Sequence, residues 1–384
     1  MPLRVVRTPG TSAEYRRRAP DDLGFAVRFQ ELDGLEVQRR AVTAPASFDV
    51  IEHWSLTTEL AWTASAIQPI EVERIANWSD VLALENSSNL MDELKVGKGV
   101  SPREILFIQP DGELGATASP QVSMVPTTYQ FDSFGYHSSL RRTLFPGEVE
   151  SWGWLLDDRW RGLTAITAHA PIAIVEMALA SQARGLMTFE DIGNLQIHEI
   201  DRLIALLIDY KHRGHFRAFW ETSSQSAALL RSGDVVIESM WPGAATETAG
   251  SDIVTAVPAE GTRAWLIGLS ISSRCTGEQL ERAYAYINWS LSGWSGAHAT
   301  RYGLYATAPG AMSKYLTEDE WDFWYCGKPA RSEMLDLAGR RVAGVGDVRV
   351  GGSCVRRIRE VAVWNTFMNE YNYLVRRWRD FMTA

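Results

Sequence analysis

Residues 125–136 constrain the fold of this chain more than any other stretch. The residue before a proline avoids the helical region, so Val125-Pro126 predicts extended backbone, and the threonines and aromatic residues that follow favour a strand. Gln130 and Asp132 are polar residues that an ordinary buried strand would not contain. A second Val-Pro run of similar design covers residues 257–271. Two such strands, one leaving a segment and one returning to it, predict a lobe inserted into another lobe.

The second run also starts a series of motifs. Residues 257–265 follow the pattern Val-Pro-x-Glu-Gly-Thr-x-x-Trp, and an apolar strand and the motif Ala-Tyr-Ala-Tyr-Ile-Asn-Trp at 283–289 come after it. The other motifs are Ser47-Phe48-Asp49-Val50, Ser232-Gly233-Asp234-Val235-Val236, Met240-Trp241-Pro242-Gly243 and Val363-Trp364-Asn365. Taken together, in the order in which they occur along the chain, these motifs resemble the spermidine/putrescine-type substrate-binding proteins of bacterial ABC transporters. The resemblance runs from residue 3 to residue 384.

The resemblance implies an α/β, two-lobed periplasmic binding protein fold (type II-like) with two crossover strands. Lobe 1 is expected to comprise 1–128 and 268–384, and lobe 2 to be the insertion 129–267. The local patterns agree with an α/β fold, because predicted strands alternate with segments of helical periodicity. The expected strands near the N-terminus cover 3–8, 24–29 and 47–52, and the expected helices cover 54–66, 171–184, 197–213, 277–291 and 356–382.

Charge and composition exclude several classes of protein. A net charge of −9 leaves no basic surface to neutralise phosphates, which argues against nucleic acid as a partner. Arg16-Arg17-Arg18 is followed by Ala19-Pro20-Asp21-Asp22 where an export signal would need an apolar segment, so these arginines are interpreted as a solvated helix face. No run of 18 apolar residues exists. A periplasmic location is therefore expected from the resemblance, with a leader either removed or upstream of the recorded start.

The sequence shows no arrangement typical of a catalytic or metal site. Gly293-Trp294-Ser295-Gly296 follows a predicted helix, whereas a nucleophile elbow needs a preceding strand. His212 and His215 have no recognisable third ligand. We therefore expect no enzyme, no metal and no cofactor. Two rival classes remain: the effector domain of a transcription regulator, which would need a DNA-binding helix-turn-helix, and a transferase or hydrolase on the same scaffold.

The three cysteines leave two alternatives open. Cys275, Cys326 and Cys354 are too few for a disulfide scaffold and show no C-x-x-C spacing. Cys326 and Cys354 each lie in a glycine-containing loop of the same C-terminal section (Cys326-Gly327 and Gly352-Ser353-Cys354), so they could pair in an oxidising compartment. The alternative is three buried or half-buried thiols.

The chain departs from polyamine binders at the positions where those proteins hold amines. The resemblance places acidic residues at positions that here are Ala170, Ala173 and Ile267. Burying an extended di- or tri-cation without these carboxylates would cost several kcal/mol. A long polyamine is therefore disfavoured as the ligand.

The remaining candidates suit a zwitterion. Aromatic rings attract an ammonium group, Asp132 could supply an anionic contact, and Arg217 or the hydroxyls of Thr222, Ser223 and Ser224 could hold a carboxylate near a helix start. Alternative structural roles are an apolar helix face for Trp54, a hinge contact for Asp132 and a surface position for Arg217. The candidate ligand-binding residues are Trp54, Tyr129, Asp132, His169, Arg217, Trp241, Trp265 and Tyr305.

These observations predict the periplasmic solute-binding component of an ABC importer. It would capture a small amine- or amino-acid-like solute, such as 4-aminobutyrate, an amino acid or an opine, by hinge closure. Its expected partners are the solute and an ABC permease in the inner membrane, with no nucleic acid and a monomeric state. The alternative ligand is a polyamine.

Overall fold

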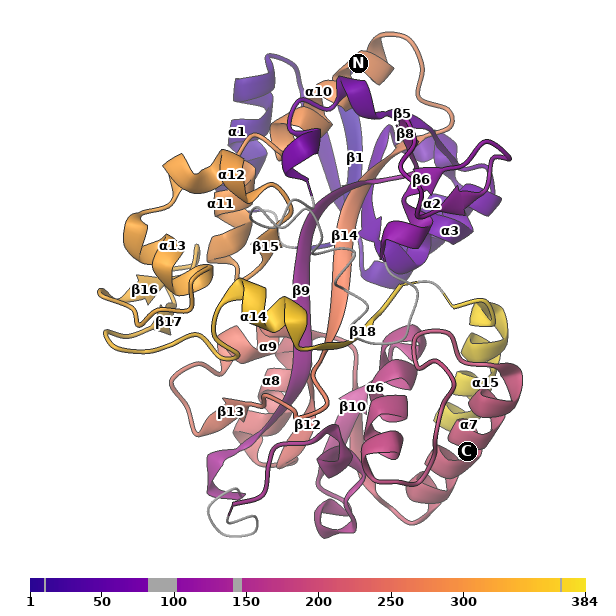
Figure 1. The fold of residues 1–384 in the computed structure, drawn as a ribbon, viewed down its shortest axis with the longest axis vertical. Coiled ribbons are helices and arrows are strands. Elements are labelled where there is room, and N and C mark those ends of the chain that lie inside the picture. The colour runs from indigo at the N-terminus through magenta and orange to yellow at the C-terminus, as the bar shows by residue number, and fades with distance from the viewer. Residues whose placement is uncertain (10–11, 82–101, 141–146, 367) are drawn as a thin grey trace. The chain divides into compact units, whose positions relative to one another are not determined.

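The computed structural model describes residues 1–384 apart from 10–11, 82–101, 141–146 and 367. The described residues form two compact units. Unit 1 contains those in 1–81, 102–130 and 265–321, and unit 2 those in 131–264 and 322–384. The strands β9 (Val125–His137) and β14 (Thr262–Ser272) each have residues in both units (Figure 1). They begin within or just after the two Val-Pro runs, so the predicted strands that connect the two halves of the chain are present.

Unit 1 is built on a mixed sheet. The strand β1 (Leu3–Arg7) pairs in parallel with β2 (Val27–Glu31) and β3 (Val50–Trp54), and β3 runs antiparallel to β14. Tyr15, Tyr286 and strand residues such as Val5 form a core in which helices pack on this sheet. The helices of this unit are α1 (Ala13–Leu23), α2 (Gly34–Thr43), α3 (Ser55–Thr63), α10 (Glu278–Ser290), α11 (Trp294–Arg301) and α12 (Pro309–Met312). Its short strands are β4 (Ile67–Gln68), β5 (Ile70–Glu71), β6 (Phe107–Ile108), β7 (Leu114–Gly115), β8 (Gln121–Val122) and β15 (Tyr305–Ala306).

Unit 2 has a second mixed sheet. The strand β10 (Thr164–Thr167) lies between β11 (Phe216–Trp220) and β12 (Ile237–Met240), parallel to both. β12 and β13 (Ile253–Thr255) run antiparallel to β9. The other strands are β16 (Met334–Leu335), β17 (Arg341–Ala343) and β18 (Val361–Trp364). The helices are α6 (Ala170–Ala183), α7 (Ile197–His212), α8 (Ser223–Ser232), α9 (Pro242–Glu247), α14 (Cys354–Arg359) and α15 (Tyr371–Thr383), and α13 (Glu318–Trp324) begins in unit 1 and ends in unit 2.

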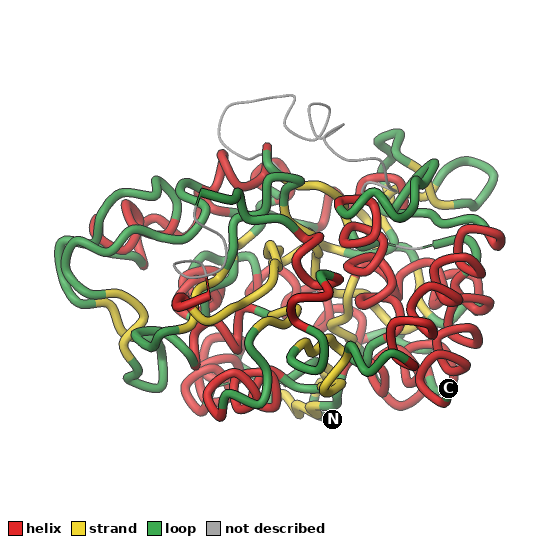
Figure 2. Tube along the Cα trace, turned by 90° about the horizontal axis from the view of Figure 1, so that it is seen from below, coloured by secondary structure: helices red, strands yellow, loops and turns green. Residues whose placement is uncertain are grey.

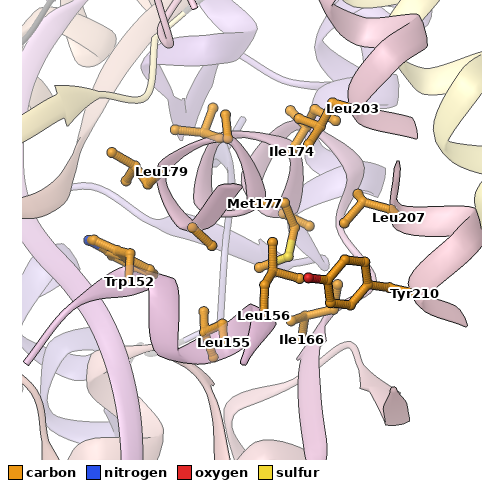
Figure 3. Packing of buried hydrophobic residues seen from close by; sticks show 14 of the residues in the cluster. Trp152, Leu155, Leu156, Ile166, Ile174, Met177, Leu179, Leu203, Leu207 and Tyr210 are labelled. Carbon is orange, nitrogen blue, oxygen red and sulfur yellow. The ribbon is translucent and has the colours of Figure 1, made fainter. Parts of the chain in front are cut away.

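The helix α6 forms the centre of the unit 2 core. Its residues are buried without interruption from Ala170 to Ser181, as expected for a helix that is apolar on all sides. Figure 3 shows Ile174 beside Leu203, and Met177 in the same cluster as Leu207. Each large apolar side chain buried in this way contributes roughly 1.5–3 kcal/mol. The core thereby fixes the start of α6, directly after His169.

The C-terminal section differs from the expectation in two ways. The helix predicted over 356–382 is wrong, because α14 ends at Arg359, the strand β18 follows, and α15 begins only at Tyr371. The β-branched and aromatic residues of β18 favour a strand, and β18 pairs in parallel with β14. Residues 322–384, expected in lobe 1, group with unit 2. The reason is packing: α15 lies against α6 and α7, and Figure 2 shows the C-terminus in a region of the molecule that is rich in helices.

Candidate functional site

Three parallel strands of unit 2 end at the same edge of the sheet, and a helix starts after each. Thr167 ends β10 before α6, Trp220 ends β11 before α8, and Met240 ends β12 before α9. Ligands of open α/β sheets bind at the carboxyl ends of the strands, where helix N-termini supply N–H groups without intrahelical partners. We call residues 167–170, 220–223 and 240–243 the strand-end site.

His169 is the residue just before α6 and is 9 % exposed. Its Nε2 lies 3.0 Å from the backbone oxygen of Glu221. A carbonyl oxygen only accepts, so Nε2–H donates, and in the tautomer with this proton Nδ1 is left as an acceptor. Nδ1 is buried and has no hydrogen-bond partner among the described residues. A buried polar atom without a partner is costly, which marks Nδ1 as a position where a ligand donor would be stabilised.

Trp241 lies beside His169, with ring centroids 5.3 Å apart. Trp220 packs edge-on against Trp241 at 4.7 Å and 84°. The indole Nε1–H of Trp241 is a donor, and it too is buried without a partner among the described residues. The strand-end site therefore holds an unused acceptor, an unused donor and aromatic rings next to one another.

Two further contacts hold the strand-end site in place. Trp378 of α15 donates from Nε1 to the carbonyl of Ala168 at 2.9 Å, which fixes the loop before His169. A side chain on Gly243 would come within 2.7 Å of the Ser223 hydroxyl oxygen, so glycine allows the starts of α8 and α9 to approach closely. The role of Trp378 was not predicted, because a contact between residues 210 positions apart leaves no local pattern in the sequence.

The other two candidates in unit 2 have ionic partners within the unit. Arg217 is more than half exposed and lies 3.5 Å from Asp234. Asp132 is 3 % exposed and accepts from the Arg263 guanidinium, whose Nε lies 3.1 Å from Oε1 of Glu176. As ligand contacts, Arg217 and Asp132 stay predictions.

The buried group around Arg263 was missed in the sequence analysis. Burial raises the pKa of Glu176 to about 7, against the opposing effect of the nearby guanidinium. The available signal was a glutamate within the otherwise apolar run of α6. A second buried carboxyl, Glu238 of β12, accepts from the Ser226 hydroxyl, and burial raises its pKa to about 9.

Unit 1 contains the remaining four candidates. Tyr129 of β9 and Tyr305 of β15 are paired in the sheet and stacked, with ring centroids 5.4 Å apart at 18°, and both are almost fully buried. Trp54 ends β3 opposite Ile267 of β14, and Trp265 lies two residues earlier on β14; both indoles are half-buried. Their ligand contacts also stay predictions.

Within the described residues, no group of three or more His, Cys, Asp or Glu side chains is arranged to hold a metal ion. Among the same residues, no helix is both long and apolar enough to cross a membrane.

Comparison with solved structures defines the class of fold. The chain is similar to the spermidine/putrescine ABC transporter substrate-binding protein PotD of Streptococcus pneumoniae, with 12% identity, a TM-score of 0.64 and coverage of 100% of this chain and 99% of that chain. It is similar to the binding protein AgtB of A. tumefaciens, solved with agropinic acid (12%, 0.59, 100% of each chain), and to the Atu4243 GABA receptor (13%, 0.60, 99% of this chain and 97% of that chain). The predicted two-lobed α/β periplasmic binding protein fold is thus confirmed.

The sequence profile of the bacterial extracellular solute-binding proteins matches residues 52–321. The chain belongs to this family, whose role is to bind solutes for transport rather than to catalyse reactions. The predicted relationship to polyamine-type binding proteins is confirmed. A search of curated proteins finds no match.

Proposed function

We propose that the protein captures a small amine- or amino-acid-like solute, such as 4-aminobutyrate, an amino acid or an opine, and delivers it to an ABC permease of the inner membrane. One observation carries the proposal: His169 Nδ1 and Trp241 Nε1–H are an unused acceptor and an unused donor on two rings whose centroids lie 5.3 Å apart in the strand-end site. An amino group can donate to the imidazole, and a carboxylate can accept from the indole and from helix N–H groups.

The alternative ligand is a polyamine. Apolar residues at the positions where polyamine binders have acidic residues argue against it. Ala170, Ala173 and Ile267 are each at least nine-tenths buried, so none of these positions offers a carboxylate to an ammonium group. Polyamines carry several positive charges and no acceptor for the indole N–H. The solved structures with this fold include proteins named for spermidine and putrescine, for GABA and for a complex with agropinic acid. Both ligand classes therefore enter the test.

Thermal unfolding of the protein with a solute panel tests the proposal. The panel contains spermidine, putrescine, 4-aminobutyrate, the common amino acids and agropinic acid. A solute present at about 100 times its Kd stabilises the folded state by about 2.7 kcal/mol, a shift of several degrees. We expect the shift with a zwitterion or opine, and calorimetry should then give saturable binding without turnover. Stabilisation by spermidine alone would refute the ligand class, and turnover of any solute would support the enzyme alternative.

Hinge closure, the periplasmic location and the monomeric state are part of the same proposal. A ligand that stabilises a closed arrangement shifts the population toward it. Small-angle scattering with and without the ligand measures this directly, and we expect a smaller radius of gyration when ligand is bound. An unchanged radius at saturating ligand would contradict hinge closure. Fractionation of cells expressing the natural gene tests the location.

A further inference from the structure

Two short stretches of unit 2 that are far apart in the sequence meet at Cys326 and Cys354. The backbone N–H of Cys354 donates to the carbonyl oxygen of Tyr325 at 2.9 Å. A side chain on Gly327 would clash with the backbone nitrogen of Ser353, so the two backbones touch on the next residue as well. The two cysteines therefore lie on neighbouring backbone segments, and the hydrogen bond joins Cys354 to the residue just before Cys326.

This geometry places the two Cα atoms within disulfide range. The Cα of Cys326 follows directly on the peptide whose oxygen accepts from Cys354. Standard backbone dimensions then put the Cα atoms roughly 5–7 Å apart, against the 4.4–6.8 Å of disulfides.

The third cysteine provides an internal contrast. Cys275 lies in unit 1, is buried, and belongs to the core of that unit. Burial raises the pKa of its thiol to about 12, and a thiol without thiolate character is a poor nucleophile. Cys326 is exposed, so an external oxidant can reach it, and Cys354 is buried beside it.

We propose that Cys326 and Cys354 form a disulfide when the protein meets a low-molecular-weight disulfide such as oxidised glutathione. The Cys326 thiolate attacks one glutathione sulfur, forming a mixed disulfide and releasing one glutathione thiolate. The Cys354 thiolate then attacks the Cys326 sulfur and releases the second. The two protons lost by the cysteines end on the two glutathione thiolates, so the protein is oxidised by two electrons and the glutathione is reduced by two.

The segment enclosed by this disulfide buries some apolar side chains and exposes others. It contains the hairpin β16–β17, and its buried apolar residues include Ala330, Met334 and Ala343. It is held by backbone hydrogen bonds such as Ala330 N–H to Asp347 O at 2.9 Å. Four of its large apolar side chains are exposed: Leu335, Val345, Val348 and Val350. A disulfide would stabilise this segment mainly by limiting the conformations of the unfolded chain.

The test uses the full chain, incubated with oxidised glutathione or with dithiothreitol and then denatured, alkylated and weighed intact. We expect one alkylated cysteine after oxidation, Cys275, and three after reduction, with a peptide linking Cys326 to Cys354 in a non-reducing digest. The Cys275→Ser variant should still form the link. Three alkylated cysteines after oxidation, or a link through Cys275, would overturn the proposal.

The single variants test which cysteine reacts with glutathione first and whether the other completes the disulfide. In Cys354→Ser, Cys326 cannot complete the second step, so we expect a stable adduct with one glutathione, whereas Cys326→Ser should gain little glutathione because Cys354 is buried. Reduction of the oxidised natural chain should lower its melting temperature by roughly 3–6 °C. The double variant Cys326→Ser/Cys354→Ser should melt like the reduced chain under both conditions. Equal glutathione adducts on both single variants would contradict the assigned geometry.

Discussion

The Nε atom of Arg263 lies 3.1 Å from Oε1 of Glu176, and both side chains are at most 1 % exposed. Asp132 accepts from the same guanidinium. A buried charge group of this kind contributes little net stability, but removing one member leaves the others uncompensated. Because Asp132 and Arg263 lie on β9 and β14, the group ties both of these strands to α6 within unit 2.

Replacing Arg263 by Met should therefore destabilise the protein by roughly 3–5 kcal/mol near pH 7.5. The loss should be smaller near pH 5, because Glu176, whose pKa is about 7, is then protonated and no longer adds a buried charge. Urea denaturation at both pH values measures the two losses. Arg217→Met is the matched control, since Arg217 is more than half exposed and should change stability by at most about 0.5 kcal/mol. Equal losses at both pH values would show that the ionisation of Glu176 is not responsible.

Glu238 predicts a second pH dependence. Its folded-state pKa of about 9 lies above the unfolded value, so the folded protein holds a proton that the unfolded chain loses above pH 4.5. Stability from this group is full below the unfolded pKa and falls as the pH rises toward 9. Glu238→Gln, which mimics the protonated acid, should be more stable than the natural chain at pH 8.5, by roughly 1–3 kcal/mol, and about equal at pH 4.5. The exposed Glu190→Gln variant should show no such difference.

The strands that hold the buried charge group could be predicted from the sequence, but the contacts between its members could not. The Val-Pro runs predicted β9 and β14 because proline and β-branched residues act locally on the backbone. Asp132 and Arg263 are 131 positions apart and Arg263 and Glu176 are 87 apart, and no local pattern links them. A predicted ligand contact, Asp132, thus has a partner that the sequence did not suggest.

The same limit explains the C-terminal section and the strand-end site. Arginines alternate with apolar residues on both sides of Val361–Trp364, so the helical periodicity of the sequence runs on through these residues. They form a strand because they pair with β14, and the local sequence does not show that pairing. His169 and Trp241 were identified singly from the resemblance. Their proximity depends on β10 and β12 being neighbours, which is a property of the sheet order.

The stacked pair Tyr129 and Tyr305 predicts an energetic coupling within unit 1. Their rings are 5.4 Å apart and nearly parallel, an arrangement worth about 0.5–1.5 kcal/mol beyond burial. A double-mutant cycle with Tyr129→Leu and Tyr305→Leu should return a coupling of that size in urea denaturation. The cycle of Tyr129→Leu with Phe48→Leu is the control, because Phe48 lies in the separate core around α2, and those losses should add within about 0.5 kcal/mol. A coupling near zero for the tyrosine pair would contradict the stacking.

His169 and Trp241 allow the ligand contacts to be tested atom by atom, once the solute panel has supplied a ligand. Trp241→Phe keeps an aromatic ring and removes the N–H donor, while His169→Leu removes the Nδ1 acceptor. Each loss leaves a buried ligand group without its partner, so we expect affinity measured by calorimetry to fall roughly 10- to 100-fold. His169→Asn carries a side-chain oxygen close to the position of Nδ1 and should recover most of the affinity lost in His169→Leu. The exposed His212→Leu variant should bind as the natural chain does. If His169→Leu and His212→Leu bind equally well while both fold normally, the strand-end site does not contact the solute.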